Sequence, residues 1–175
     1  YLYFISIILL IIGSLAGTWM ISGIVPSMIY YGLKILNPTI FLVAACIISA
    51  IVSIATGSSW STVATVGLAL LGIGTAMGIG EGMVAGAIIS GAYFGDKMSP
   101  LSDTTNLAPA MAGTDLFTHI KYMMYTTIPS FTITLIIFLG IGFTYTTSGT
   151  QDISELLTAI TNSFNVSGWL FLVPG

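Results

Sequence analysis

Two aspartates, Asp96 and Asp103, lie in the most polar stretch of this sequence, residues 96–106. Carboxylate, hydroxyl and amide oxygens are hard ligands that suit a small hard cation. A carboxyl group removed from water also binds a proton more readily than one in water. The stretch therefore predicts a site that holds either a cation or a proton, and a solvated polar loop is the alternative. Five further oxygen-bearing side chains accompany the aspartates: Ser99, Ser102, Thr104, Thr105 and Asn106.

A second run of hydroxyl side chains, at residues 56–67, includes Ser58, Ser59 and Thr62. With the backbone carbonyls around Gly57, these hydroxyls could complete a sodium site or polarise a carboxylate substrate. The alternative is that each Ser or Thr bonds to the carbonyl four residues earlier and only bends a helix.

Helix geometry limits how the two aspartates can act together. On a straight helix, residues 96 and 103 would be about 10.5 Å apart along the axis, on one face but too distant to clasp one ion. Pro100 would break a helix at an interior position. We therefore expect a bent or unwound segment at Ser99–Pro100.

The composition predicts a membrane protein. The 175 residues are 55% hydrophobic and 5% charged, with a mean hydropathy of +1.03, whereas soluble domains carry about 25% charged residues. The lipid bilayer is therefore the expected surrounding. The basic residues are three lysines, too few for the basic footprint of a nucleic-acid-binding protein. Cys46 is the only cysteine, which excludes a Cys-based zinc site.

The elements that position these residues are predicted to be helices of a polytopic transmembrane bundle, an all-α fold. The chain begins at Tyr1 in an apolar run and ends just after a new apolar segment starts at Val166, so we expect a fragment of a longer protein. Gly82, Gly86 and Ser90 recur every four residues, which predicts close packing against another helix. The positive-inside rule places Lys97 and Lys121 on the cytoplasmic side and loop 146–165 opposite. Within one domain, 1–175, we expect a broken apolar segment 1–33, a span 39–56, a broken polar stretch 57–67, short helices 68–77 and 83–95, the ion-site motif 96–106, an interfacial helix 114–125 capped by Thr114 or Asp115, a span 126–145 and an extramembrane loop 146–165.

Several motifs together resemble the NhaC-type sodium:proton antiporters, from about Gly13 to Phe138. They are GTW at 17–19 with IYYG at 29–32, ATGSSW at 55–60 and GAYFGDKMSPLSDTTN at 91–106. The resemblance implies an inverted-repeat transporter with discontinuous or re-entrant helices, of which this chain holds roughly one repeat. It also implies a multi-pass protein of the cell (cytoplasmic) membrane that exchanges Na⁺ for H⁺. By this resemblance the protein is a secondary transporter and not an enzyme, and it uses no cofactor. Carried over by position, the ion and proton site comprises Asp96, Ser99, Asp103, Thr104, Thr105 and Asn106, with Ser58, Ser59 and Thr62 beside them, and the two aspartates as Na⁺ ligands.

Other functions stay open at this point. For some relatives the resemblance implies exchange of malate plus protons for lactate plus sodium, although Lys97 is the only cation in the motif and the site suits a cation better. An intramembrane aspartyl protease is a distant alternative. Such an enzyme needs two aspartates that come from two helices and lie close enough to share a proton, whereas Asp96 and Asp103 lie in one polar stretch. The oligomeric state, a homo-oligomer included, is left open.

Overall fold

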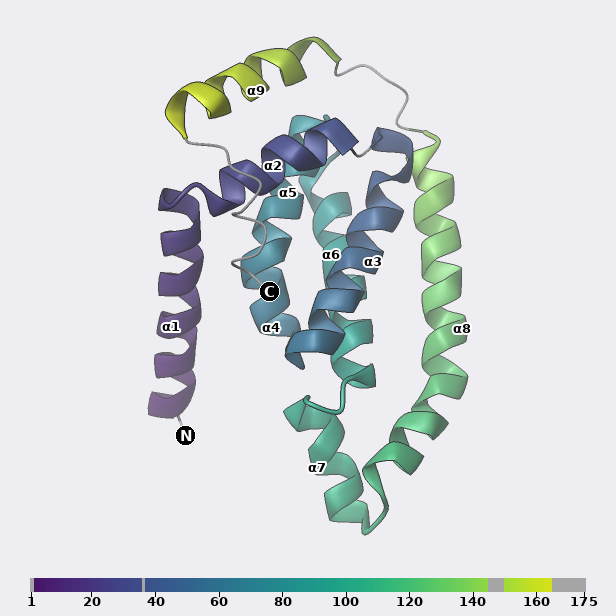
Figure 1. Ribbon diagram of the computed structural model, residues 1–175. Coiled ribbons are helices and arrows are strands. Elements are labelled where there is room, and N and C mark those ends of the chain that lie inside the picture. Colours follow the sequence, from purple (N-terminus) through teal and green to yellow (C-terminus); the bar gives the residue numbers. More distant parts are fainter. Residues whose placement is uncertain (1, 36, 145–149, 165–175) are drawn as a thin grey trace.

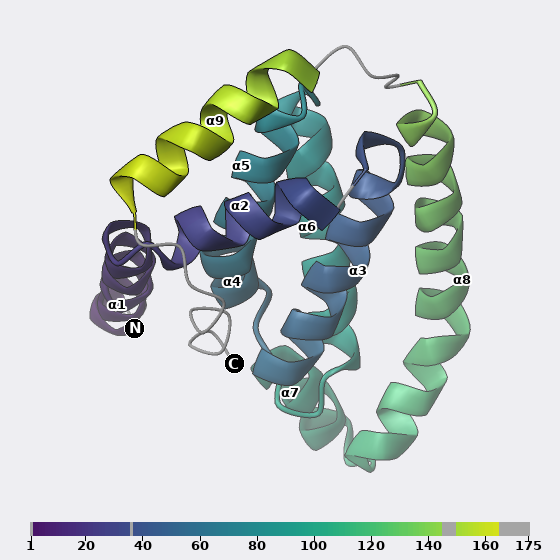
Figure 2. The same cartoon turned by 45° about the horizontal axis from the view of Figure 1, so that its top comes forward.

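The computed structural model describes residues 2–35, 37–144 and 150–164, and every regular element in these ranges is a helix. Helices α3 and α6 lie side by side at the centre, with α8 along one flank and α1 at the opposite edge (Figures 1 and 2). Helices α2 and α9 cross one end of the bundle, and α7 lies at the other end. The helices are α1 (Leu2–Ile21), α2 (Ile24–Ile35), α3 (Pro38–Thr56), α4 (Ser59–Thr62), the π-helix η1 (Val63–Gly67), α5 (Leu68–Ala76), α6 (Glu81–Met98), α7 (Asp103–Ala112), α8 (Leu116–Gly142) and α9 (Thr150–Ser163).

Three helical stretches of the described chain are long and apolar enough to cross a membrane: Pro38–Thr56, Ser59–Ala76 and Leu116–Gly142. The first covers the predicted span 39–56. It starts where the Asn37 side chain accepts a hydrogen bond from the Thr39 amide at 3.1 Å, with Pro38 at the first helical position. The sequence therefore sets both the position and the length of α3.

The contact between α3 and α6 depends on two glycines of α6. A Cβ atom on Gly91 would collide with the carbonyl oxygen of Cys46, and one on Gly95 with the carbonyl oxygen of Ala50. These glycines allow the two backbones to approach closely, as in other membrane helix pairs. Gly82 and Gly86, predicted to serve this purpose, have no described atom within 4 Å of an added Cβ. Within the described chain, close packing therefore uses a different face of α6.

Several predicted boundaries differ from the structure. The interfacial helix 114–125 and the span 126–145 form one helix, α8, which Asp115 caps by accepting from the Thr118 amide at 3.0 Å. Hydroxyl side chains in the polar part of α8 bond to carbonyls of the same helix. These polar residues therefore do not interrupt the helix. Similarly, residues 59–76 run as one continuous helical stretch instead of a broken segment 57–67 and a short helix 68–77, and α6 extends beyond 83–95 at both ends.

Both ends of the chain also differ in detail from the predictions. Most of the predicted loop 146–165 is the helix α9, and residues 146–149 and 165 lie outside the described residues. Ile153, Leu156, Leu157 and Ile160 carry the helical apolar spacing that would have identified it. In the broken segment 1–33, the interruption lies at residues 22–23, and Pro26 sits in the first turn of α2, where proline is tolerated.

Candidate functional site

Two interruptions between helices meet at one end of the bundle. The first, residues 57–58, separates α3 from α4, and the second, residues 99–102, separates α6 from α7. An added Cβ on Gly57 would lie 2.7 Å from the backbone carbon of Leu101. The buried Ser99 hydroxyl donates to the carbonyl of Ile54 at 2.7 Å. The unwound segment predicted at Ser99–Pro100 is therefore confirmed, and it is tied to the end of α3.

Asp96 lies in the last turn of α6, directly before this interruption. Its Oδ2 accepts a hydrogen bond from the Ser59 hydroxyl at 2.9 Å, and Ser59 is 4% exposed. Its Oδ1 is buried and has no hydrogen-bond partner among the described residues. A buried polar atom without a partner is uncommon in native proteins. This oxygen is therefore available to a proton or a cation.

Most hydroxyls of the first run bond to the nearby backbone. The Ser58 hydroxyl caps α4 by accepting from the Ser61 amide at 3.3 Å, and the buried Thr62 hydroxyl donates to the Ser58 carbonyl at 2.9 Å. Thr65 likewise donates to the Ser61 carbonyl at 2.6 Å. The helix-bending alternative thus describes Thr62 and Thr65, whereas Ser59 reaches the carboxylate.

The π-helix η1 follows one turn after Ser59. Widened turns of this kind are frequent at functional sites of helical proteins. No pattern in the sequence indicated it.

Asp103 is separated from Asp96 by the interruption and opens α7. It is exposed, and its Oδ1 accepts from the Thr104 amide at 2.8 Å. The Thr104 hydroxyl pairs with that of Ser102 at 2.9 Å. The described chain therefore brings Asp96 to Ser59 and leaves Asp103 facing outward.

The remaining two predicted ligands, Thr105 and Asn106, stabilise the backbone conformation around the interruption at residues 99–102. The Thr105 hydroxyl donates to the backbone carbonyl of Asp96 at 3.1 Å. The Asn106 amide donates to the carbonyls of Pro100 and Ser102, each at 2.7 Å. Carbonyls at a helix end lack partners within the helix. Thr105 supplies such a partner at the end of α6, and Asn106 bonds to two carbonyls of the interruption, so in the described chain both side chains stabilise the backbone beside Asp96.

The contact at Gly57 gives a first prediction. Gly57 has a φ of 71°, and a side chain in this region costs about 1–2 kcal/mol before any overlap with Leu101. Gly57→Ala is expected to lower the unfolding temperature of the full-length protein in detergent. The control is Gly78→Ala, since Gly78 has a φ of 76° but open space around it. Equal losses in the two variants would show that the contact between the interruptions contributes nothing.

The chain is similar to known antiporters over nearly all its length. The profile described as the Na⁺/H⁺ antiporter family matches residues 91–174. The Na⁺/H⁺ antiporter NhaC of Alkalihalophilus pseudofirmus is 52% identical over 167 residues, which cover 95% of this chain and 36% of the relative. The malate-2H⁺/Na⁺-lactate antiporter of Bacillus subtilis is 46% identical over 170 residues, 96% of this chain and 36% of the relative.

A more distant relative is the arginine/ornithine antiporter ArcD of Halobacterium salinarum, 38% identical over 171 residues, 95% of this chain and 35% of the relative. No solved structure matches the chain. The chain spans about a third of the length of these relatives. Because NhaC antiporters of two species are 52% and 43% identical to it over 95% and 96% of its length, the chain belongs to the NhaC-type Na⁺/H⁺ antiporter family.

Proposed function

We propose that the full-length protein is a multi-pass transporter of the cell membrane that exchanges Na⁺ for H⁺, with Asp96 as the group that binds both. The observation that carries this proposal is the buried, unpartnered Oδ1 of Asp96 beside an interruption of two helices. The names of the NhaC relatives support the choice of cargo. Because one carboxylate cannot hold a proton and bind a cation strongly at once, the two cargoes exclude each other.

Helix ends of both kinds meet at the site. Helices α3 and α6 end there, with partial negative charge at their C-terminal ends, and α4 and α7 begin there, with partial positive charge. The preference for a cation therefore rests on the carboxylate of Asp96. The Ser59 hydroxyl fixes one carboxylate oxygen and leaves the other free. We propose that Asp103 and the hydroxyls of Ser58, Thr62 and Thr104 complete the coordination when the site closes around Na⁺.

The proposed cycle follows alternating access. A proton arriving at Asp96 from one side releases Na⁺ to that side, and movement of one helical bundle against another then exposes the site to the opposite side. The interruptions at residues 57–58 and 99–102 are suitable points for this movement, because non-helical backbone at membrane depth survives where it faces protein or a wet cavity. The cycle needs no cofactor and no covalent chemistry.

Proton flux tests this function. Inverted vesicles that contain the full-length protein are acidified inside, and Na⁺ is then added without any organic acid. Alkalinisation of the interior by Na⁺, but not by choline, is expected. A response that requires malate or lactate would replace simple Na⁺/H⁺ exchange with organic-acid exchange.

Ser59 provides a second prediction. Ser59→Ala removes the hydrogen bond to Asp96 Oδ2 and is expected to raise the half-saturating Na⁺ concentration about tenfold, with a smaller change in maximal rate. Ser59→Thr keeps a hydroxyl and should restore most of the affinity. Ser14→Ala is the control, since the exposed Ser14 hydroxyl bonds to the Ile11 carbonyl within α1, away from the site. Unchanged Na⁺ dependence in Ser59→Ala would remove Ser59 from the site.

A further inference from the structure

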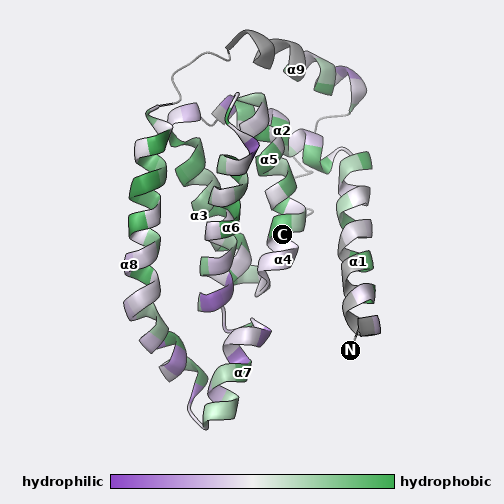
Figure 3. Cartoon of the chain, turned by 180° about the vertical axis from the view of Figure 1, so that it is seen from behind, coloured by the Kyte–Doolittle hydropathy of each residue, from purple (hydrophilic) through white to green (hydrophobic). Residues whose placement is uncertain are grey.

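In the described chain, three buried side-chain oxygens have no hydrogen-bond partner: Oδ1 of Asp96 and the hydroxyls of Ser27 and Ser49. Ser49 is fully buried in the interior of α3, about two helical turns before the end of that helix. Strongly hydrophilic residues gather at the end of α6, whereas weakly polar or apolar residues fill the middle of the bundle (Figure 3). An unpaired hydroxyl in such surroundings is unfavourable unless it meets a bound group.

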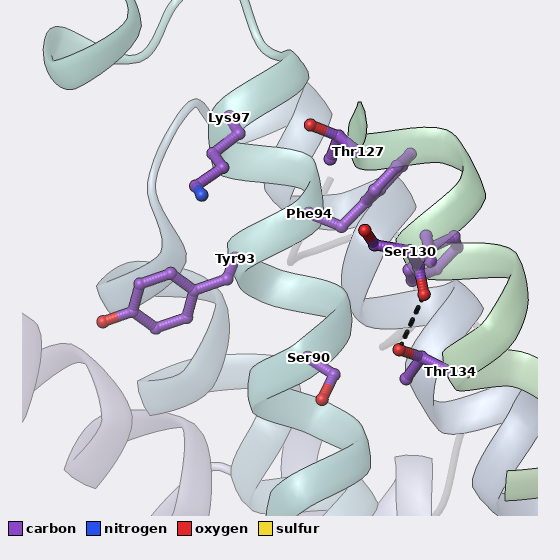
Figure 4. Close-up of a pocket in the computed structure, with 8 residues that line it drawn as sticks. Ser90, Tyr93, Phe94, Lys97, Thr127, Ser130 and Thr134 are labelled. Atoms are coloured by element: carbon purple, nitrogen blue, oxygen red, sulfur yellow. Dashed lines mark hydrogen bonds between the residues drawn. The ribbon is translucent and has the colours of Figure 1, made fainter. Parts of the chain in front are cut away.

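The Ser49 hydroxyl does not bond to its own helix. A hydroxyl in a helix commonly donates to a carbonyl one turn earlier. Thr134 on α8 does so, to the Ser130 carbonyl at 2.9 Å (Figure 4). Ser90 on α6 likewise donates to the Gly86 carbonyl at 2.7 Å. Ser49 makes no such bond, although α3 continues as a regular helix around it, so its hydroxyl is free to bond to a group between the helices.

Ser49 lies on the face of α3 that is directed to the candidate site. Ser53, one turn later on this face, donates to the Ala92 carbonyl of α6 at 2.6 Å. Thr56, also on this face, has its hydroxyl 3.3 Å from that of Thr62 in α4. Helix α6 carries Asp96 and α4 carries its hydrogen-bond partner. This face of α3 is therefore enclosed by the two helices that hold the carboxylate.

Ser49 lies about one helical turn deeper in the bundle than Asp96. An added Cβ on Gly95 would lie 2.6 Å from the Cβ of Ser53, so Asp96, the next residue of α6, lies at the level of Ser53. Ser49 precedes Ser53 by four residues, which is about 6 Å along α3. Na⁺ has nearly the radius of Ca²⁺ and lies about 2.4 Å from its ligands, so one ion joins oxygens at most about 4.8 Å apart. A single ion therefore cannot contact both Asp96 and Ser49.

A water molecule fits this separation. Hydrogen bonds between oxygens are about 2.8 Å long, so one water spans about 5.6 Å, close to the rise from Ser53 to Ser49. The Ser53 proton is already donated to Ala92, which leaves the Ser53 oxygen as an acceptor. With the hydroxyls of Ser49 and Ser53 and an ion at Asp96, the water would have three partners, as buried waters typically do.

We propose that Ser49 holds a water molecule that is a ligand of the ion bound at Asp96, and that Ser49 thereby influences the choice between Na⁺ and Li⁺. This role rests on the cation site proposed above and adds to it a positioning residue that the ion does not touch. Selectivity between ions of different size depends on the number of ligands. Li⁺, the smaller ion, tolerates the loss of one ligand better than Na⁺. Removing the Ser49 hydroxyl should therefore weaken Na⁺ binding more than Li⁺ binding.

The test measures the Kd for Na⁺ and for Li⁺ by calorimetry, with the full-length protein in phosphatidylcholine nanodiscs and choline buffer at one pH. Ser49→Ala is expected to raise the Kd for Na⁺ about fivefold and the Kd for Li⁺ less than about twofold. Ser49→Thr and Ser49→Val introduce side chains of the same shape, so any overpacking is common to both and only the hydroxyl differs. The Kd for Na⁺ should be about fivefold higher in Ser49→Val than in Ser49→Thr.

The control is Ser27→Ala, which removes the other buried, unpartnered hydroxyl. It lies in α2, at the opposite end of the bundle from Asp96 (Figure 1). Both Kd values should stay unchanged in this variant. Equal Na⁺ affinity in Ser49→Thr and Ser49→Val, an unaltered ratio of the two Kd values in Ser49→Ala, or an equal loss in Ser27→Ala would overturn the proposal.

Two further outcomes separate this role of Ser49 from the cation site itself. If the Thr and Val substitutions at Ser49 prevent folding, the ratio of the two Kd values in Ser49→Ala decides alone. If the unaltered protein binds no Na⁺, or Asp96→Asn binds it equally well, the cation site at Asp96 is wrong and the role of Ser49 is overturned with it. Normal Na⁺ binding that depends on Asp96 but not on Ser49 overturns only the role of Ser49.

Discussion

Asp96→Asn is expected to abolish Na⁺-driven proton flux in the full-length protein while leaving membrane insertion intact. The amide has nearly the same shape as the carboxylate but can neither release a proton nor supply a negative charge to Na⁺. Losing a charged ligand worth roughly 3 kcal/mol would also lower the affinity for Na⁺ about 100-fold. The measurement is the initial rate of alkalinisation in inverted vesicles, normalised to the amount of inserted protein.

The matched control for this variant is Glu81→Gln. Glu81 is an exposed carboxylate at the opposite end of α6, and it lies outside both helix interruptions. Its neutralisation should leave the rate within about twofold of the unaltered protein, as is usual for surface changes. If Asp96→Asn exchanges normally and Asp103→Asn does not, the exchanging group is the first residue of α7, and the proposed role of Asp96 is wrong.

Gly91→Ala is expected to lower the stability of the protein strongly. The new methyl group would meet the carbonyl oxygen of Cys46, and backbone atoms of α3 cannot move aside as a flexible side chain can. Overpacking of a core typically costs 1–3 kcal/mol, and we expect a cost of about 3 kcal/mol here. The unfolding temperature in detergent and the amount of protein in the membrane should both fall.

Gly86→Ala is the control for this substitution. It makes the same chemical change in the same helix, where an added Cβ has open space within the described chain. Alanine is also favoured over glycine in a helix by roughly 0.5–1 kcal/mol, so this variant should be neutral or slightly stabilised. Equal destabilisation by both substitutions would show that α6 packs through the Gly82 and Gly86 face predicted from the sequence.

Local signals in the sequence determined the membrane character, the helical class and several helix ends. Asn37 and Pro38 start α3, Gly57 ends it, and Pro100 lies in the interruption after α6. Each of these features depends on the conformational preferences of a few neighbouring residues. Local signals misled where polarity suggested a boundary within α8, because hydroxyls can bond to their own helix and leave it intact.

Only the tertiary structure decided which of the predicted residues meet. Ser59 and Asp96 are 37 residues apart, and their hydrogen bond requires the chain to turn at residues 57–58 and α6 to pack against α3. Thr105 and Asn106 turn toward backbone carbonyls at the end of α6 and in the interruption after it, and Asp103 is exposed. The sequence determined which side chains could bind a cation, since that follows from their chemistry. Which of them share a site follows from contacts between distant helices, and single-residue patterns do not encode those contacts.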